Sequence, residues 1–450
     1  MISSTVERPD AGSGEQVYAD LCTALFASLP RSDQRRRGAE YVKGLLAVPG
    51  RKSIRRIATS AEGHAAEQSL HHFIVSSTWD LAPVRQALTR YLVGAFRREA
   101  PRAWVVRPTV IPKSGQRSLG VGRRYVAEAG QMVNAQQAVG VWMASEHQSF
   151  PVNWRLHVGR SGPQGASGRP HGTRPDSAAA EALGDCVLEA VLEVAGDREL
   201  PRLPVVMDAR EFDAATVLGL LQETGAPFLV RVDPGLPLAA APARDGAEAQ
   251  PAERLLGGVG RQLRRPVVWS DRHPGEPPRR QLVAGTAVRS LARDGAAGTA
   301  PRPDLLLLGI GPVGSSWPGE YWLTDQTHLP PLTLVRLSRL IAPAGRDLDA
   351  ITERAGIFDF AGRSYTGWHR HATLASAAHA VNALTNGPAI TPRRAPAPPK
   401  PSMPTKPLPT GRKEPIALST ARLPAKPVKP VEYSGSRTSP LLHRAGNIVS

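Results

Sequence analysis

The chain contains few cysteines, few aromatic residues and no long apolar segment. Its 450 residues include only Cys22 and Cys186. Both lie in apolar, helix-like segments, so we expect ordinary buried thiols rather than a disulfide framework or a thiolate metal site. No run of about 18 uncharged apolar residues occurs, so no membrane-spanning helix is expected. The first residues lack the charged-then-apolar order of a secretory signal, and we therefore expect a cytoplasmic protein.

Acidic residues are scarce relative to basic ones. The 39 Asp and Glu face 56 Lys and Arg, which gives a formal net charge of +17. Residues 391–450 carry 11 − 2 = +9 of this charge, and the remaining 390 residues carry 17 − 9 = +8. The body of the protein is therefore basic as well, which indicates a polyanionic partner, most simply nucleic acid.

Composition and periodicity divide the chain into four parts. The first is a flexible N-terminus and the last is rich in Pro, Lys and Arg, with thirteen prolines in residues 391–450. Such a tail cannot bury a core and should be disordered, either as a polyanion-binding arm or as a solvated extension. The expected boundaries are 1–15 for the N-terminus, 16–100 for a helical domain, 101–385 for an α/β core with a β-rich insertion at 233–330, and 386–450 for the tail.

The helical domain carries a basic face. In the helix expected from Arg51 to Ala58, Ile54 and Ile57 share one side, and the basic residues lie on the other. Short basic helices packed together fit a DNA-binding domain, although a bundle with a solvated basic face would show the same pattern.

The next segment predicts an alternation of strands and helices. Its order is β-β-β-α-β-α-β, from strands at 103–110, 137–144 and 151–158, a helix at 177–194, a strand at 203–208, a helix at 212–224 and a strand at 227–232. This succession resembles an RNase H-like fold. Short strands follow in the insertion, and helices return at 332–340, 347–355 and 366–384.

Asp208 closes the fourth of these strands. A carboxylate at the carboxyl end of a strand in an α/β unit is a common site of metal chemistry. The alternative is an acid that merely ends the strand or caps the next helix.

Several segments are together specific enough to suggest a family. They are Val105–Thr109, Ile111–Gly115, Ser118–Val121, Arg123–Tyr125, Asn134–Gln137, Ala144–His147, Pro151–Leu156 and Gly362–His371. They resemble the DDE transposases of bacterial insertion sequences, in an actinobacterial-type branch with a β-rich insertion before the last acid. The resemblance spans roughly residues 30–385.

The resemblance implies DNA cleavage and rejoining by two Mg²⁺ ions held by three carboxylates. Asp208 matches the second acid and would be a metal ligand. Arg107 stands at the expected position of the first acid, and either Ala361 or Gly345 at that of the third. A homodimer is expected from the resemblance alone.

An arginine at a metal site has a large electrostatic effect. Two unit charges about 4 Å apart interact by about 4 kcal/mol at an effective dielectric of about 20, and a divalent ion roughly doubles this. We therefore expect the fold to be retained and the chemistry to be impaired or lost, unless a nearby acid compensates. The candidates in sequence are Asp347, Asp349, Glu353 and Asp359. Arg107 could instead bind a DNA phosphate or extend into solvent.

From the basic helix and the motif segments we expect DNA contacts at ten positions. They are Lys52, Arg55, Arg56, Lys113, Arg117, Arg123, Arg124, Arg363, His369 and Arg370. Trp368 is expected in the core. A zinc site at His369 and His371 is not expected, because no further Cys or His cluster accompanies them.

Overall fold

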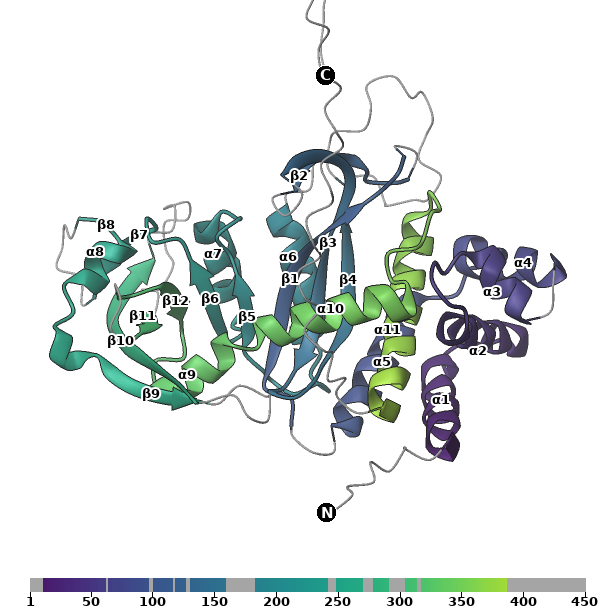
Figure 1. Cartoon of the computed structure of the whole chain (residues 1–450), viewed down its shortest axis with the longest axis horizontal. Coiled ribbons are helices and arrows are strands. Elements are labelled where there is room, and N and C mark those ends of the chain that lie inside the picture. The colour runs from purple at the N-terminus through teal and green to yellow at the C-terminus, as the bar shows by residue number, and fades with distance from the viewer. Residues whose placement is uncertain are drawn as a thin grey trace, which may run out of the picture. The chain divides into compact units, whose positions relative to one another are not determined.

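The computed structural model describes most of the first 386 residues (Figure 1). The described ranges are 11–61, 64–96, 100–115, 118–126, 130–158, 183–241, 248–269, 278–290, 304–313 and 317–386. The expected Pro-rich tail and the first ten residues lie outside them. Within these ranges no helix is long and apolar enough to cross a membrane.

The N-terminal part is helical, as expected. Its elements are α1 (Ala11–Phe26), α2 (Ser32–Ala47), α3 (Ile54–Ala61), α4 (His64–His71), the π-helical turn η1 (His72–Ser76) and α5 (Leu81–Ala95). Leu21 and Leu25 of α1 and Leu88 of α5 are fully buried. Asp80 begins α5 by accepting a hydrogen bond from the backbone N–H of Ala82, which satisfies one of the free donors of the first turn.

A mixed sheet follows. Its first strands are β1 (Ala103–Pro112), β2 (Gly122–Val126), β3 (Gln131–Ala144), β4 (Ser149–His157), β5 (Val205–Asp208) and β6 (Phe228–Val232). β1 and β4 pair with β3 in antiparallel fashion, whereas β5 pairs parallel to both β1 and β6. The spatial order β4-β3-β1-β5-β6 is compatible with the RNase H-like expectation. The hairpin strand β2, paired with β3, was not identified from the sequence.

Helices cover both faces of this sheet. β4 directs Asn153 and Arg155 toward α6 (Leu183–Ala195) and Trp154 toward α11 (Tyr365–Asn386), so these two helices lie on opposite faces. On the α11 side, α10 (Ile341–Ala355) crosses the strands (Figure 1). α7 (Ala214–Thr224) connects β5 to β6.

The β-rich insertion extends the same sheet. Its elements are β7 (Pro237–Ala240), β8 (Gln250–Pro251), α8 (Ala252–Gly257), the 3₁₀ turn η3 (Arg261–Leu263), β9 (Arg265–Trp269), β10 (Arg279–Ser290), β11 (Leu305–Pro312) and β12 (Glu320–Thr324). β12 pairs with β6, so the insertion strands continue the core strands by hydrogen bonds. α9 (Pro331–Ser338) then leads to α10.

Helix α11 is enclosed by the rest of the fold. Every residue from 367 to 381 is buried. The helix contacts β4 on one side and α1, α2 and α5 on others. A helix surrounded in this way carries apolar or hydrogen-bonded side chains around its whole circumference. Trp368 is 1% exposed, which confirms its expected place in the core.

Candidate functional site

Asp208 lies at the carboxyl end of β5, beside two arginines on the neighbouring strands. The parallel register pairs Val106 of β1 with Met207 of β5, which brings Arg107 next to Asp208. On the other side, Asp208 pairs with Arg231 of β6. Side chains at paired positions point to the same face of a sheet, so Arg107, Asp208 and Arg231 form a row across three strands.

The carboxylate of Asp208 is already occupied by guanidinium groups. Nε and Nη2 of Arg210 donate to its two oxygens at 2.9 and 2.7 Å, and Nη1 of Arg231 lies 3.5 Å from Oδ2. Burial raises the pKa of Asp208, whereas the hydrogen bonds from Arg210 and the charges of Arg210 and Arg231 lower it. The lowering is the larger effect, so the pKa of Asp208 lies below its ordinary value. Asp208 is therefore an ionised partner of two arginines. Neither arginine was expected at the site from the sequence, although Arg210 stands only two residues from Asp208.

Arg107 is anchored to α10 rather than extended into solvent. Its Nη1 donates to the carbonyl oxygen of Ile341 at 3.0 Å. Burial lowers the pKa of the guanidinium, and the negative charges of Asp349 and Asp208 oppose this effect. The alternative of a side chain that snorkels to solvent does not agree with this contact.

The structure places Gly345, rather than Ala361, beside Arg107. A Cβ atom built on Gly345 would lie 3.0 Å from Nη1 of Arg107 and 3.2 Å from its Cζ. Ala361 follows Phe360, whose carbonyl oxygen accepts a bond from Lys113 Nζ just beyond the far end of β1. Six residues of strand separate Lys113 from Arg107, a distance of about 20 Å. Ala361 is therefore not the position that faces the row.

Of the four other acids suggested by the sequence, one lies close enough to Arg107 to act on its charge. Asp347 accepts hydrogen bonds from the N–H and hydroxyl of Ser149, and Asp359 accepts one from the N–H of Lys52 at 2.6 Å. Glu353 lies eight residues beyond Gly345 in α10, about 12 Å along the helix. Only Asp349, among these four, acts on the charge of Arg107.

These side chains do not fit the Mg²⁺ ions that the family resemblance implies. Mg²⁺ requires free oxygen ligands in octahedral arrangement, usually including carboxylates. At this site the carboxylate of Asp208 is bound by two guanidinium groups, and Arg107 adds a third positive charge. Across the described ranges no three His, Cys, Asp or Glu side chains are grouped so that they could hold a metal ion.

The ten side chains expected to contact DNA differ in accessibility. Arg55, Arg56, Arg123 and Arg363 are exposed. Lys113 and Arg124 are partly buried, and Arg117 lies outside the described residues. Lys113 donates to the carbonyl oxygens of Phe358 and Phe360, and burial lowers its pKa to about 8.

Burial contradicts the expected DNA contacts of three residues. Lys52, His369 and Arg370 are at most 5% exposed. Nε2 of His369 accepts from the N–H of Leu156 at 3.2 Å, and Arg370 donates to the carbonyl oxygens of Ile74 and Trp79. The histidines and the arginine of this motif therefore join α11 to its neighbours. The sequence predicted this helix but not the burial of its polar residues, because α11 is buried on all sides and has no exposed face to compare them with.

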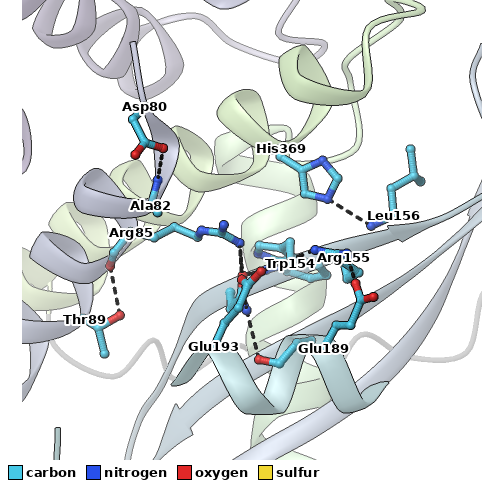
Figure 2. A network of polar contacts seen from close by, with 12 residues as sticks. Asp80, Ala82, Arg85, Thr89, Trp154, Arg155, Leu156, Glu189, Glu193 and His369 are labelled. Atoms are coloured by element: carbon cyan, nitrogen blue, oxygen red, sulfur yellow. Dashed lines mark hydrogen bonds and ion pairs between the residues drawn. The ribbon is translucent and has the colours of Figure 1, made fainter. Parts of the chain in front are cut away.

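A second polar cluster connects α5, β4 and α6 (Figure 2). Arg85 of α5 donates to Asn153 and pairs with Glu193 at 2.8 Å, while Arg155 pairs with Glu189 and Glu193. These charges balance one another within the cluster. We therefore assign it to the attachment of α5 to the sheet rather than to ligand binding.

Two comparisons indicate what the chain is similar to. A family described as DDE superfamily endonuclease matches residues 24–298, a range that includes β1 and β5. A probable transposase for the insertion sequence element IS701 of Microchaete diplosiphon is 29% identical over 129 residues. That alignment covers 29% of this chain and 33% of the relative, so the similarity spans about a third of the relative's length.

Proposed function

The chain belongs to the DDE superfamily endonucleases, and from this premise we propose that it is a transposase-family protein that binds DNA with impaired or lost cleavage chemistry. The relative for IS701 favours transposition, rather than another endonuclease reaction, as the origin of the protein. The role we propose is that of a regulatory or decayed derivative, which occupies DNA without processing it.

The observation that carries the loss of chemistry is the pairing of Asp208 with arginines. Its carboxylate contacts Arg210 at 2.7 Å and Arg231 at 3.5 Å, and Arg107 stands on the adjacent strand. Asp208 could bind a cation only after giving up these ion pairs. The cation would then face Arg107, whose repulsion of a divalent ion is about 8 kcal/mol at 4 Å and an effective dielectric of about 20.

DNA binding is supported by charge. The chain has a formal net charge of +17. Arg55, Arg56, Arg123 and Arg363 are exposed and available for phosphate contacts. Contacts of this kind release counterions, so the affinity should fall steeply with salt.

The experiment measures binding and cleavage separately. Binding of a labelled random-sequence duplex is followed by fluorescence anisotropy over a range of salt concentrations, and nicking of a supercoiled plasmid is assayed with Mg²⁺ and with Mn²⁺. We expect salt-dependent binding and no nicking. Nicking that disappears in Asp208→Ala would show an active enzyme and overturn the proposal, as would the absence of any DNA binding.

An active transposase is the second candidate, favoured by one observation. Asp349 lies one turn beyond Gly345 in α10, and its charge acts on Arg107. If DNA binding drew Arg107 away, Asp349 and Asp208 could act together. The nicking assay on Asp349→Asn separates this candidate from the first, because only an active enzyme would lose activity.

The remaining proposals follow from the family. DNA is the expected partner, the cytoplasm the expected location and a homodimer the expected assembly. Light scattering of the purified chain, with and without DNA, tests the assembly.

A further inference from the structure

Gly345 is a glycine inside a helix where glycine is unfavourable. It lies within α10, and glycine in a helix interior costs about 1 kcal/mol relative to alanine. The structure supplies a reason. A Cβ at this position would lie 3.0–3.3 Å from Nη1, Cζ and Nη2 of Arg107, so a larger side chain would displace the guanidinium. The absence of a side chain at Gly345 therefore makes room for Arg107.

The guanidinium of Arg107 has few partners for a half-buried cation. Nη1 donates to the carbonyl oxygen of Ile341, one turn before Gly345. Nε is buried without a hydrogen-bond partner in the described part of the chain. Asp208 and Asp349 act on it by charge, and within the described residues neither forms an ion pair with it. Nη2 remains as a donor for a further group.

Three arginines surround the carboxylate of Asp208. Arg107, Arg210 and Arg231 contribute +3 and Asp208 contributes −1, so this row and Arg210 sum to 3 − 1 = +2. The charge of Asp349 acts on Arg107 and that of Glu211 acts on Arg210, and these two acids offset the excess. Glu320 also lies near Arg210 and Arg231, but its carboxylate is bound by Arg339 at 2.7 Å.

We infer that Arg107 takes the place of a metal ion, so that the site holds a phosphodiester group of DNA by its guanidinium without a divalent cation. Gly345 is the residue that gives Arg107 this position. The inference rests on the proposed function, since the phosphate is that of bound DNA. Planar guanidinium groups bind phosphate through charge-assisted hydrogen bonds, which are stronger than neutral ones.

The first test removes the guanidinium. Binding of the labelled duplex is measured in EDTA for the wild type and for Arg107→Gln, with Arg90→Gln on α5 as a control that removes the same charge elsewhere. We expect Arg107→Gln to bind about tenfold more weakly, since a hydrogen bond to a charged group contributes about 1.5 kcal/mol. The slope of log K against log salt should fall by about one.

The second test keeps every charge. Gly345→Leu fills the space of the guanidinium, so it should weaken DNA binding about as much as Arg107→Gln while the net charge stays the same. Thermal melts verify that both variants are folded. Wild-type affinity and salt slope in both variants would overturn the inference.

The third test measures whether the site binds a divalent metal ion. Mn²⁺ titration followed by electron paramagnetic resonance should show no binding to the wild type, and it should show binding to the double variant Arg107→Asp with Gly345→Glu. Mn²⁺ bound by the wild type and lost in Asp208→Ala would contradict the inference. The proposed function is tested separately from this inference. It is wrong if the wild type binds no DNA or if the wild type nicks DNA.

Discussion

The hydroxyl of Tyr41 lies 2.8 Å from Nδ1 of His371, and this contact joins α2 to α11, two neighbouring helices whose bonded residues are 330 positions apart in sequence. Nε2 of His371 lies 2.9 Å from the carbonyl oxygen of Gly356. A carbonyl only accepts hydrogen bonds, so Nε2 carries a proton. Burial lowers the pKa of the imidazole from 6.5 to about 4, despite the opposing bond to Gly356 and the charge of Asp359. The ring is therefore neutral at pH 7, and its Nδ1 accepts from the hydroxyl of Tyr41.

The buried histidines predict loss of stability in mild acid. The unfolded chain binds a proton at His371 near pH 6.5, whereas the folded chain resists it until about pH 4. The stabilisation is complete above pH 6.5 and is lost as the pH falls toward 4. His371 alone should lower the free energy of unfolding by about 2 kcal/mol between neutral pH and about pH 5, and His369, with a pKa lowered to about 3 by burial, adds to this loss.

Urea unfolding at both pH values measures the effect. His371→Gln should reduce the pH dependence, whereas His72→Gln, at an exposed position, should leave it unchanged. Equal pH dependence in the wild type and His371→Gln would show that His371 is not held neutral.

Two arginines of α5 predict different contributions to stability. Arg85 has a side chain 16% exposed and bonds both Glu193 and Asn153, while Arg90 is 48% exposed and pairs with Glu199, itself 67% exposed. Arg85→Gln should lower the free energy of unfolding by about 2 kcal/mol, because it leaves partly buried acceptors without a cation. Arg90→Gln should cost less than about 1 kcal/mol. Chemical denaturation of the two variants checks this, and equal losses would refute the assignment of the cluster in Figure 2 to attachment of α5.

Two glycines of α7 predict opposite effects of alanine. Gly219 lies in the helix interior with open space around its Cβ position, so Gly219→Ala should stabilise the protein by about 1 kcal/mol. Gly225 ends the helix with φ at +63°, a left-handed conformation that costs other residues about 1 kcal/mol or more. Gly225→Ala should therefore lower the melting temperature while Gly219→Ala raises it. Changes of the same sign would contradict the described end of α7.

Neutralising Asp208 should strengthen DNA binding. Asp208→Asn removes the negative charge that occupies Arg210 and Arg231, so affinity for a labelled duplex should rise a few-fold at low salt. Asp20→Asn, at an exposed position on α1, removes the same charge elsewhere and serves as the control. A loss of affinity in Asp208→Asn would instead support a role of the carboxylate in holding a cation for DNA.

The strands of the core could be predicted because their patterns are local. The apolar segments at Ala103 and Val205 each form a strand close to the expected range, and helices follow where apolar residues recur at helical spacing. The short strands β2 and β7 could not be identified, because they span only five and four residues and their sequences do not alternate between apolar and polar residues.

The candidate site could be predicted only in part. The sequence indicated Asp208 and Arg107, which the parallel pairing of β1 and β5 brings together. The sequence left two positions open for the third acid, since the choice between Gly345 and Ala361 depends on where α10 crosses the sheet. Burial of Arg370 was likewise unpredictable, because its partners, the carbonyl oxygens of Ile74 and Trp79, lie almost 300 residues earlier.

The pairing of β12 with β6 determines which shortened forms of the protein could be stable. Thr324 Oγ1 donates to the carbonyl oxygen of Phe228 at 2.6 Å, and β12 satisfies the outer backbone groups of β6. Excision of residues between these strands, β12 included, would leave β6, which has four apolar residues and Arg231, as a bare sheet edge and a template for aggregation. Unpaired strand edges of this kind promote aggregation. A minimal domain designed for crystallisation or expression must therefore retain β12, or protect β6 with a charged residue or a proline.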